Sequence, residues 1–259
     1  MNQPPAYPPP HDLLRGKTVL ITAAAGTGIG FAAAQRCAEE GARVMISDIH
    51  ERRLGEAADA LEKETGVRPP TCVCNVTDEQ QVQNLIASAV DELGHIDVLI
   101  NNAGLGGTVN VVDMQDEQWD AVIGITLTGT MRMTRAVLPH MIARESGAIV
   151  NNASVLGWRA QVGQSHYAAA KAGVMALTRC SALEVADHGI RINAVSPSIA
   201  AHKFLSKVMP EGLLEELSEK EAFGRAAEPF EVANVMVFLA SDYSSYMTGE
   251  VVAVSSQHP

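Results

Sequence analysis

The chain has 259 residues, of which 47% are hydrophobic and 19% are charged, and this composition excludes a protein that is disordered throughout. Its 19 basic and 30 acidic residues give a formal net charge of −11, so we expect neither a nucleic acid nor a membrane surface as a partner. No apolar run is long enough for a transmembrane helix, and no basic-then-apolar signal opens the chain. Four cysteines are too few for a disulfide framework, so we expect a cytoplasmic protein without a metal site.

Proline occupies five of the first ten positions, which excludes a helix or a central strand there. Residues 1–14 are therefore predicted to form a proline-rich flexible tail, and the alternative is an arm that lies on a neighbouring subunit. Residues 15–259 show no sign of a second domain or of an internal repeat, so we predict one domain there.

Short apolar runs rich in β-branched residues alternate along the chain with stretches of helical periodicity. The predicted strands are 18–22, 43–48, 71–76, 97–103, 148–154, 191–197 and 250–255. The predicted helices are 29–40, 52–64, 79–93, 117–143, 166–186 and 231–239. Strands that are apolar on both faces and alternate with helices predict an α/β fold with a parallel sheet covered on both sides.

The interval 199–225 contains no predicted strand and only short amphipathic pieces rich in glutamate. It follows a strand at the edge where ligands bind in open α/β sheets, so we predict that it is a substrate lid. An ordinary pair of surface helices is the alternative.

A glycine-rich turn joins the first predicted strand to the first predicted helix. Such a turn lets backbone N–H groups approach a pyrophosphate, and the helix N-terminus adds a partial positive charge. The residues predicted to bind a dinucleotide here are Ala24, Gly26, Thr27, Gly28, Ile29 and Gly30.

Asp48 ends the second predicted strand, close to the expected distance from the glycine-rich turn. A carboxylate at this place binds the hydroxyls of the adenosine ribose and repels a 2′-phosphate. Asp48 therefore favours NAD over NADP, although Arg52 and Arg53 lie nearby. The alternative is that Asp48 only caps the following helix.

Tyr167 and Lys171 are four residues apart in a predicted helix, so they share a face. Ser154 precedes them, at the end of the fifth predicted strand. A tyrosine of ordinary pKa is a poor base at neutral pH, but a lysine ammonium one turn away stabilises its phenolate. With that lysine and a positive nicotinamide nearby, a lowered tyrosine pKa is expected. The serine hydroxyl can hold a substrate oxygen beside the tyrosine. A half-buried tyrosine with a surface lysine is the alternative.

Further motifs occur in a characteristic order: Asn101-Asn102-Ala103-Gly104, the run from Ile190 to Pro197, and Thr248-Gly249-Glu250. With these motifs and the Ser-Tyr-Lys set, residues 15–255 resemble the short-chain dehydrogenase/reductase family. The resemblance implies a doubly wound, parallel, seven-stranded, Rossmann-like sheet in three α/β/α layers. It also implies hydride transfer between a nicotinamide and a carbinol or carbonyl carbon.

The resemblance also implies roles for single residues. Tyr167 would be the general acid/base, Ser154 would orient the substrate oxygen, and Lys171 would lower the tyrosine pKa and bind the nicotinamide ribose. Thr126 stands where relatives carry an asparagine of a proton relay, and we keep it as a candidate relay member. The cofactor contacts implied besides Tyr167 and Lys171 are Ile49, Asn75, Val76, Asn102, Ala103, Gly104, Pro197 and Ile199.

Several positions depart from the family pattern. Ala24 stands at the first glycine of the turn, where an alanine at positive φ would be strained by about 1 kcal/mol. Ser198 replaces a glycine after Pro197, and His202 replaces a threonine that often holds the carboxamide. The chain continues after Val254 with Ser-Ser-Gln, where relatives commonly have Asp-Gly-Gly. These changes permit a second hypothesis, in which the protein is a cofactor-binding scaffold or sensor with little catalysis. The retained Ser-Tyr-Lys set argues against that hypothesis.

The interval 199–225 is rich in apolar residues, so we predict an apolar substrate pocket. Its predicted contacts are Val155, Trp158, His202 and Phe204. Basic residues near it suit a bulky alicyclic substrate that carries a carboxylate or a coenzyme A thioester. The Pro-Ser-Ile-Ala turn and the Gln-His-Pro ending resemble actinobacterial members linked to degradation of steroid rings. The competing hypothesis is a 3-oxoacyl thioester reductase. Such reductases usually use NADPH, and Asp48 argues against that cofactor.

Family members often assemble as tetramers, so a homotetramer is expected, with contacts through the helices predicted at about 117–143 and 166–187. The partner expected besides a second copy of the chain is a small-molecule substrate.

Overall fold

The computed structural model describes residues 3–201 and 212–256, and its centre is a seven-stranded parallel sheet in the order β3-β2-β1-β4-β5-β6-β7. The strands are β1 (Thr18–Ile21), β2 (Arg43–Asp48), β3 (Thr71–Val73), β4 (Val98–Asn101), β5 (Gly147–Asn152), β6 (Ile190–Pro197) and β7 (Val251–Val254). The strand order reverses between β1 and β4, where one half of the sheet meets the other. In parallel α/β sheets this switch point, at the carboxyl ends of the strands, is where ligands bind.

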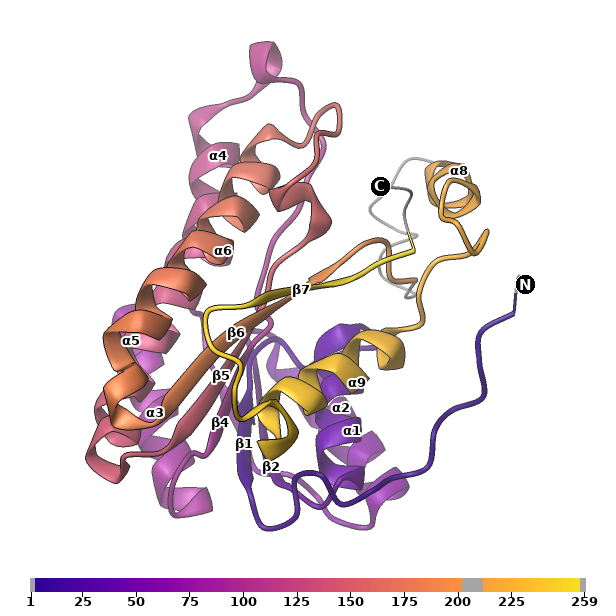
Figure 1. Cartoon of the computed structure of the whole chain (residues 1–259). Coiled ribbons are helices and arrows are strands. Elements are labelled where there is room, and N and C mark those ends of the chain that lie inside the picture. Colours follow the sequence, from indigo (N-terminus) through magenta and orange to yellow (C-terminus); the bar gives the residue numbers. More distant parts are fainter. Residues whose placement is uncertain (1–2, 202–211, 257–259) are drawn as a thin grey trace.

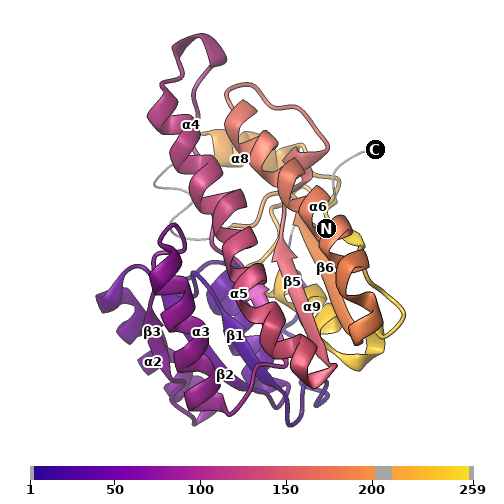
Figure 2. The ribbon, with the colours of Figure 1, turned by 90° about the vertical axis from the view of Figure 1, so that its left-hand side faces the viewer.

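Helices cover both faces of the sheet (Figures 1 and 2). The helices are α1 (Ile29–Glu39), α2 (Glu51–Thr65), α3 (Glu79–Leu93), α4 (Asp116–Val122), α5 (Gly129–Arg144), α6 (Ser165–Val185), α8 (Leu213–Glu219) and α9 (Pro229–Ala240). The two apolar cores show which helix lies where. Side chains of α1, α2 and α9 pack on one face of the sheet, and those of α3, α5 and the end of α6 pack on the other.

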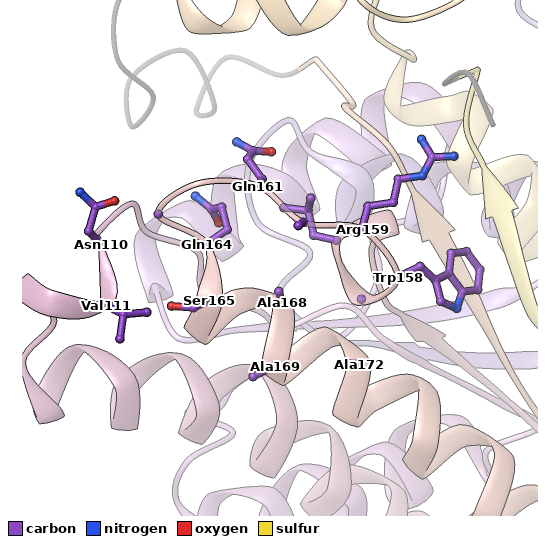
Figure 3. Close-up of a pocket in the computed structure, with 14 residues that line it drawn as sticks. Asn110, Val111, Trp158, Arg159, Gln161, Gln164, Ser165, Ala168, Ala169 and Ala172 are labelled. Atoms are coloured by element: carbon purple, nitrogen blue, oxygen red, sulfur yellow. The ribbon is translucent and has the colours of Figure 1, made fainter.

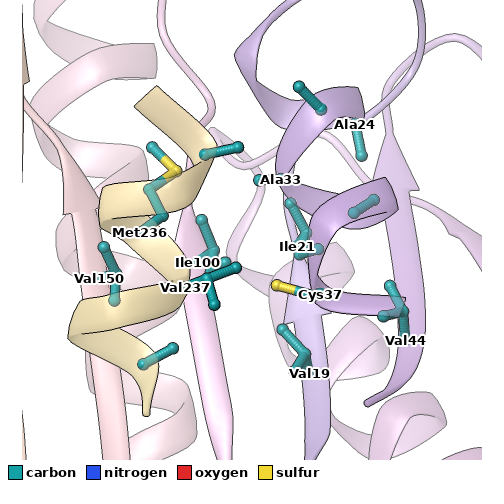
Figure 4. Close-up of a cluster of buried hydrophobic side chains, with 14 of the residues drawn as sticks. Val19, Ile21, Ala24, Ala33, Cys37, Val44, Ile100, Val150, Met236 and Val237 are labelled. Carbon is teal, nitrogen blue, oxygen red and sulfur yellow. The ribbon is translucent and has the colours of Figure 1, made fainter. Parts of the chain in front are cut away.

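Alternation along the strands explains why both faces are buried. In β1, Val19 and Ile21 point to the α1 and α9 side, where Figure 4 shows them beside Val44, Ile100 and Met236. Leu20 lies between them in the chain and points to the opposite core. Every residue of β1 is buried, as expected of a strand in the middle of a parallel sheet. The predicted doubly wound α/β fold is thereby confirmed.

The helix predicted at 117–143 is divided in the structure. Its first part is α4, its last part is α5, and a π-helical stretch at Ile123–Thr128 joins them. Hydrophobic periodicity does not distinguish a π-helical insertion from a continuous helix, because the apolar face is displaced by only one residue. This stretch contains Thr126 and therefore bears on the site described below.

The segment expected to be a flexible tail makes specific contacts with the domain. The Tyr7 hydroxyl donates to Glu39, and the backbone N–H groups of His11 and Leu13 both donate to Glu40. Glu40 is itself buried and forms an ion pair with Arg36, with an N–O distance of 2.6 Å. The described part of the segment therefore lies along α1, the helix that follows the glycine-rich turn. Its proline content alone gives no sign of these partners.

Among the helices of the described residues, none combines the length and the apolar character needed to cross a bilayer. The same residues hold no group of three or more histidine, cysteine or acidic side chains placed to bind a metal ion.

Candidate active site

Ser154, Tyr167 and Lys171 meet at the carboxyl end of β5. Ser154 follows that strand and is buried, and α6 brings Tyr167 and Lys171 to the same place one turn apart. The Ser154 and Tyr167 hydroxyls share a hydrogen bond. The Lys171 Nζ atom lies 5.5 Å from the centre of the tyrosine ring. The sequence-predicted set is therefore brought together, with the serine hydroxyl and the lysine amine both beside the tyrosine.

The backbone of β5 fixes the lysine. The buried Nζ of Lys171 donates to the carbonyl oxygen of Asn152 over 2.5 Å. Burial lowers the Lys171 pKa to about 8, because an ammonium group loses hydration there. The lysine therefore changes its protonation state close to physiological pH.

The pKa of Tyr167 is raised above its ordinary value, whereas the sequence predicted a lowered one. Burial is the main cause, since it disfavours the phenolate, and the hydrogen bond with Ser154 acts in the opposite direction. That expectation included the positive charge of a bound nicotinamide as well as that of Lys171, whereas the raised pKa reflects the groups of the chain alone. Within the protein chain itself, Tyr167 is thus a proton donor at neutral pH.

The glycine-rich turn forms a close cradle between β1 and α1. A Cβ atom on Gly30 would lie 2.4 Å from the Ala23 carbonyl oxygen and 2.4 Å from the Asn102 amide nitrogen, so only glycine fits. Gly26 has a φ of +110°, which favours glycine. The positive φ expected at Ala24 falls one residue earlier, at Ala23, with a φ of +51°, and Ala24 is buried in the core below.

Gly28 is the N-cap residue of α1 and offers no side-chain acceptor, so the first N–H groups of the helix are left for another acceptor. Thr27 and Ile29 flank it in the turn. A helix start of this kind, after a turn that admits no side chain at Gly30, fits the pyrophosphate of a dinucleotide.

Asp48 faces the glycine-rich turn from the end of β2. Its carboxylate accepts hydrogen bonds from the backbone N–H groups of Ala25 and His50, at 3.2 and 3.0 Å. Burial raises its pKa, and the hydrogen bond from Ala25 and the positive charge of Arg53 lower it in part. Asp48 does not cap the following helix. The N-cap residue of α2 is His50, and no side chain accepts a capping hydrogen bond there. Ile49 is half exposed beside the carboxylate.

Hydrogen bonds of the loop after β4 connect the glycine-rich turn to the end of β5. The Thr22 hydroxyl accepts from the backbone N–H groups of Asn102 and Ala103. The Asn102 side chain donates to the Ala23 carbonyl oxygen and accepts from the side chain of Asn152. A continuous series of hydrogen bonds therefore runs from the glycine-rich turn through Asn102 and Asn152 to Lys171.

Sequence reasoning missed Asn152, whose carbonyl holds Lys171 and whose side chain holds Asn102. A signal was available, since Asn151-Asn152 ends β5, and Asn101 ends β4 with Asn102 directly after it. These pairs are neighbours in the sheet, with Asn101 opposite Asn151. Amide side chains at the ends of adjacent parallel strands meet at one edge, and the sequence alone shows the pattern once the strands are aligned.

Thr126 lies within the π-helical stretch and is buried. Its hydroxyl accepts from the Leu105 N–H at 3.0 Å and lies 3.2 Å from the Leu105 carbonyl oxygen, as a donor to it. Gly104 lies between Thr126 and Lys171, since a Cβ there would be 3.5 Å from the lysine nitrogen and 3.7 Å from the threonine oxygen. Thr126 therefore holds the loop after β4 in place, whether or not it also takes part in a proton relay.

The remaining predicted cofactor contacts lie along the same edge of the sheet. The side chain of Asn75 accepts from Thr77 in the turn before α3, and Val76 is buried. Pro197 ends β6, and the carbonyl oxygen of Ile199 accepts from the N–H of Ala227.

The predicted substrate contacts are placed differently from one another. Val155 is buried, whereas Trp158 is 52% exposed and lines an open cavity of about 630 Å³ beside α6 (Figure 3). That cavity meets α6 through residues such as Ala168 and Ala172, which lie on a different helix face from the tyrosine and the lysine. His202 and Phe204 lie outside the described residues.

Comparisons with known proteins support the resemblance. A family model described as "Enoyl-(Acyl carrier protein) reductase" matches residues 23–256. A Mycobacterium tuberculosis protein named "(5R,7aS)-5-hydroxy-7a-methyl-1-oxo-2,3,5,6,7,7a-hexahydro-1H-indene-carboxyl-CoA reductase" is 62% identical over 96% of this chain and 95% of its own length. A 3-oxoacyl-[acyl-carrier-protein] reductase of Thermotoga maritima is 42% identical over 93% of this chain and 97% of its own.

A solved structure agrees with these matches. The crystal structure of a short chain dehydrogenase from Mycobacterium smegmatis is 57% identical, covers 99% of both chains and has a TM-score of 0.88. The chain therefore belongs to the short-chain dehydrogenase/reductase family. It is an oxidoreductase that acts on a hydroxyl or keto group, and its family uses a nicotinamide cofactor.

Proposed function

We propose that the protein is an NAD(H)-dependent oxidoreductase that interconverts a secondary alcohol and a ketone on a bulky alicyclic substrate carried by coenzyme A. The observation that supports the chemistry most is the tyrosine hydrogen-bonded to Ser154 with Lys171 beside its ring. The substrate class is supported by the 62% identity to a mycobacterial reductase whose name describes a bicyclic coenzyme A thioester.

Each residue of the set has a separate task in ketone reduction. The Ser154 hydroxyl donates a hydrogen bond to the substrate carbonyl oxygen, and Tyr167 donates its proton to the same oxygen. A bound reduced nicotinamide supplies the hydride to the carbonyl carbon. Lys171 stabilises the phenolate that Tyr167 leaves behind, and Asn152 holds the lysine at the distance described above. Alcohol oxidation runs through the same groups in reverse, with the phenolate as the base.

The lowered pKa of Lys171 predicts an alkaline limb in the rate of ketone reduction. Below about pH 8 the lysine is protonated and stabilises the tyrosine phenolate; above it, the neutral amine does not, so the rate falls. Measured between about pH 6 and 10 with saturating NADH, kcat/KM is expected to bend near that value. The arginine of the Lys171→Arg variant stays charged over this pH range, so its kcat/KM should begin to fall only at a higher pH. An unchanged bend in that variant would assign the limb to another group.

Asp48 supports the choice of NAD over NADP. Its carboxylate faces the glycine-rich turn, where it repels a 2′-phosphate and binds ribose hydroxyls. Asp48→Ala is expected to lower kcat/KM for NADH about 10- to 100-fold, the loss of hydrogen bonds to a charged group, and to narrow the preference over NADPH. The matched control is Glu51→Ala, an exposed acidic residue nearby that should change neither value. An unchanged NADH to NADPH ratio in Asp48→Ala would refute the NAD proposal.

A substrate panel tests the substrate class. We expect reduction of an alicyclic ketone as its coenzyme A thioester to have a higher kcat/KM than the free ketone acid or a linear 3-oxoacyl thioester. The 42% identity to a 3-oxoacyl reductase supports the linear thioester as second candidate. The highest rate with the linear thioester and NADPH would favour that candidate. No turnover of any panel member would favour the scaffold or sensor hypothesis.

We further propose that the enzyme is a cytoplasmic homotetramer that assembles through its long helices. Two exposed apolar side chains support an interface on these helices, Trp119 on α4 and Leu183 on α6, and Val111 and Val112 are exposed just before α4. Light scattering after size exclusion is expected to give four times the chain mass, and a species of 27.5 kDa would refute assembly.

A further inference from the structure

A short loop after β4 lies against the ring of Tyr167. Residues 104–108 of this loop are exposed, so burial in the core does not hold them. A Cβ atom on Gly106 would lie 3.9 Å from two carbons at the edge of the Tyr167 ring, and one on Gly107 would lie 3.3 Å from Nε2 of the buried His166. The loop backbone therefore passes directly beside the tyrosine.

The turn that precedes α6 holds this loop by hydrogen bonds. The amide nitrogen of Gln164 donates to the Gly107 carbonyl oxygen at 2.8 Å and to the Thr108 hydroxyl at 3.0 Å. The N–H of Val109 donates to the Gly163 carbonyl oxygen at 3.0 Å. The two segments also touch, since a Cβ atom on Gly163 would lie 2.8 Å from the methyl carbon of Thr108. A single amide nitrogen with two hydrogens therefore makes both side-chain bonds to the loop.

Gln164 occupies the N-cap position of α6, the helix that carries Tyr167 and Lys171, but its side chain does not cap that helix. A side chain at this position commonly accepts a hydrogen bond from the first turn, and glutamine is not among the residues preferred there. The Gln164 amide instead donates across to the loop after β4. Replacing it therefore removes contacts with the loop and takes no cap from α6.

The other end of the loop has a separate anchor. The Thr126 hydroxyl bonds to both the N–H and the carbonyl oxygen of Leu105. Gly106, which lies beside the tyrosine ring, is thus held between Thr126 on one side and Gln164 on the other. The predicted cofactor contacts at 102–104 precede the Thr126 anchor. Loss of the Gln164 bonds should therefore free the part of the loop beside the tyrosine and leave the cofactor end in place.

We propose that Gln164 is a positioning residue that holds residues 106–109 against Tyr167 and thereby fixes the tyrosine hydroxyl where it delivers its proton. We call its two hydrogen bonds with the loop the Gln164 latch. The inference rests on the proposed function, in which Tyr167 is the proton donor. Without the latch, the edge of the tyrosine ring is open to water and to rotation, so proton transfer slows while NADH still binds.

The test replaces the amide with a thioether of similar size. In Gln164→Met, the single-turnover rate of ketone reduction by NADH is expected to fall about tenfold, since displacement of a reacting group by about 1 Å costs up to about 10². The Kd for NADH, measured by fluorescence, should stay within about twofold. The ratio of the rates in H2O and D2O should rise, because proton transfer alone is slowed; a smaller folded fraction would not change it. The matched control is Gln83→Met, at an exposed glutamine of α3, which should change none of these values.

Two further variants show whether the donated hydrogen bonds matter. Gln164→Glu keeps the size of the side chain, but a carboxylate cannot donate to the Gly107 carbonyl oxygen, so its rate should fall as in Gln164→Met. Thr108→Val keeps the methyl group that meets Gly163 and removes one acceptor, so it should cost about threefold alone and nothing further in the Gln164→Met background. Additive effects, or a rate of Gln164→Met within about twofold of wild type, would overturn the proposal.

Hydrogen exchange makes the test independent of turnover. With NADH bound and no ketone present, the amides of residues 106–109 should exchange faster in Gln164→Met than in wild type and in Gln83→Met. The amide of Leu105, which Thr126 holds, should keep its wild-type rate. If wild type turns over no panel substrate, the proposed function fails while the exchange measurement still decides on the latch. Unchanged exchange at residues 106–109 would refute it.

Discussion

Replacing Tyr167 with phenylalanine is expected to lower kcat for ketone reduction about 10³-fold while the Kd for NADH stays unchanged. The variant removes one hydroxyl, which is the proton donor in the proposed mechanism, and general acid catalysis contributes about 10² to 10⁴ in rate. The Ser154 hydroxyl would still bind the carbonyl oxygen, so KM should change little. Stopped-flow absorbance of NADH under single turnover measures the chemical step directly.

The raised pKa of Tyr167 is the reason to expect that this residue itself supplies the proton. Because burial keeps the tyrosine protonated at neutral pH, no separate acid is required for reduction. Tyr243→Phe is the matched control, since Tyr243 is exposed and its replacement should leave all constants unchanged. A Tyr167→Phe variant that keeps more than about a tenth of the wild-type rate would show that another group, or water, supplies the proton.

The fold and the catalytic set follow from local patterns in the sequence. The β1 segment is apolar at every position because both its faces are covered, and this distinguishes a central parallel strand without reference to any neighbour. Tyr167 and Lys171 share a face because four residues make about one helical turn. Features of this kind depend only on residues close together in the chain, so the sequence is sufficient for them.

Features that depend on packing between distant segments were not predicted. In the sequence, Ser198 and Ser256 stand out only as departures from a family pattern. In the structure, both hydroxyls donate to the same oxygen of Glu221, a contact between residues that are distant in the chain. The rise in the pKa of Tyr167 within the chain comes from burial, which depends on how α6 packs against the sheet and is not visible in the local sequence. The positive φ falls at Ala23 and not at Ala24, and the Ala23 carbonyl oxygen accepts from Asn102, a residue of the loop after β4 that is distant in the chain.

Replacing Gly30 with alanine is expected to weaken NADH binding about 100-fold and to destabilise the fold by about 1 to 3 kcal/mol. The added Cβ would approach the Ala23 carbonyl oxygen and the Asn102 side chain to 2.4 Å, so the turn or the loop after β4 must move. Displacement of a binding group by about 1 Å has cost about 10² in other sites. NADH fluorescence titration and thermal unfolding measure the two effects.

Gly55→Ala is the matched control for this substitution. Gly55 lies within α2 with no atom near the place of its Cβ, so alanine there should stabilise the helix by about 0.5 to 1 kcal/mol and leave NADH binding unchanged. The predicted motion also reaches the catalytic end, since Asn102 bonds to Asn152, whose carbonyl holds Lys171. We therefore expect Gly30→Ala to lower kcat as well, even at saturating NADH. A variant that binds NADH normally would show that the close contact relaxes locally, and that the turn is not a rigid cradle.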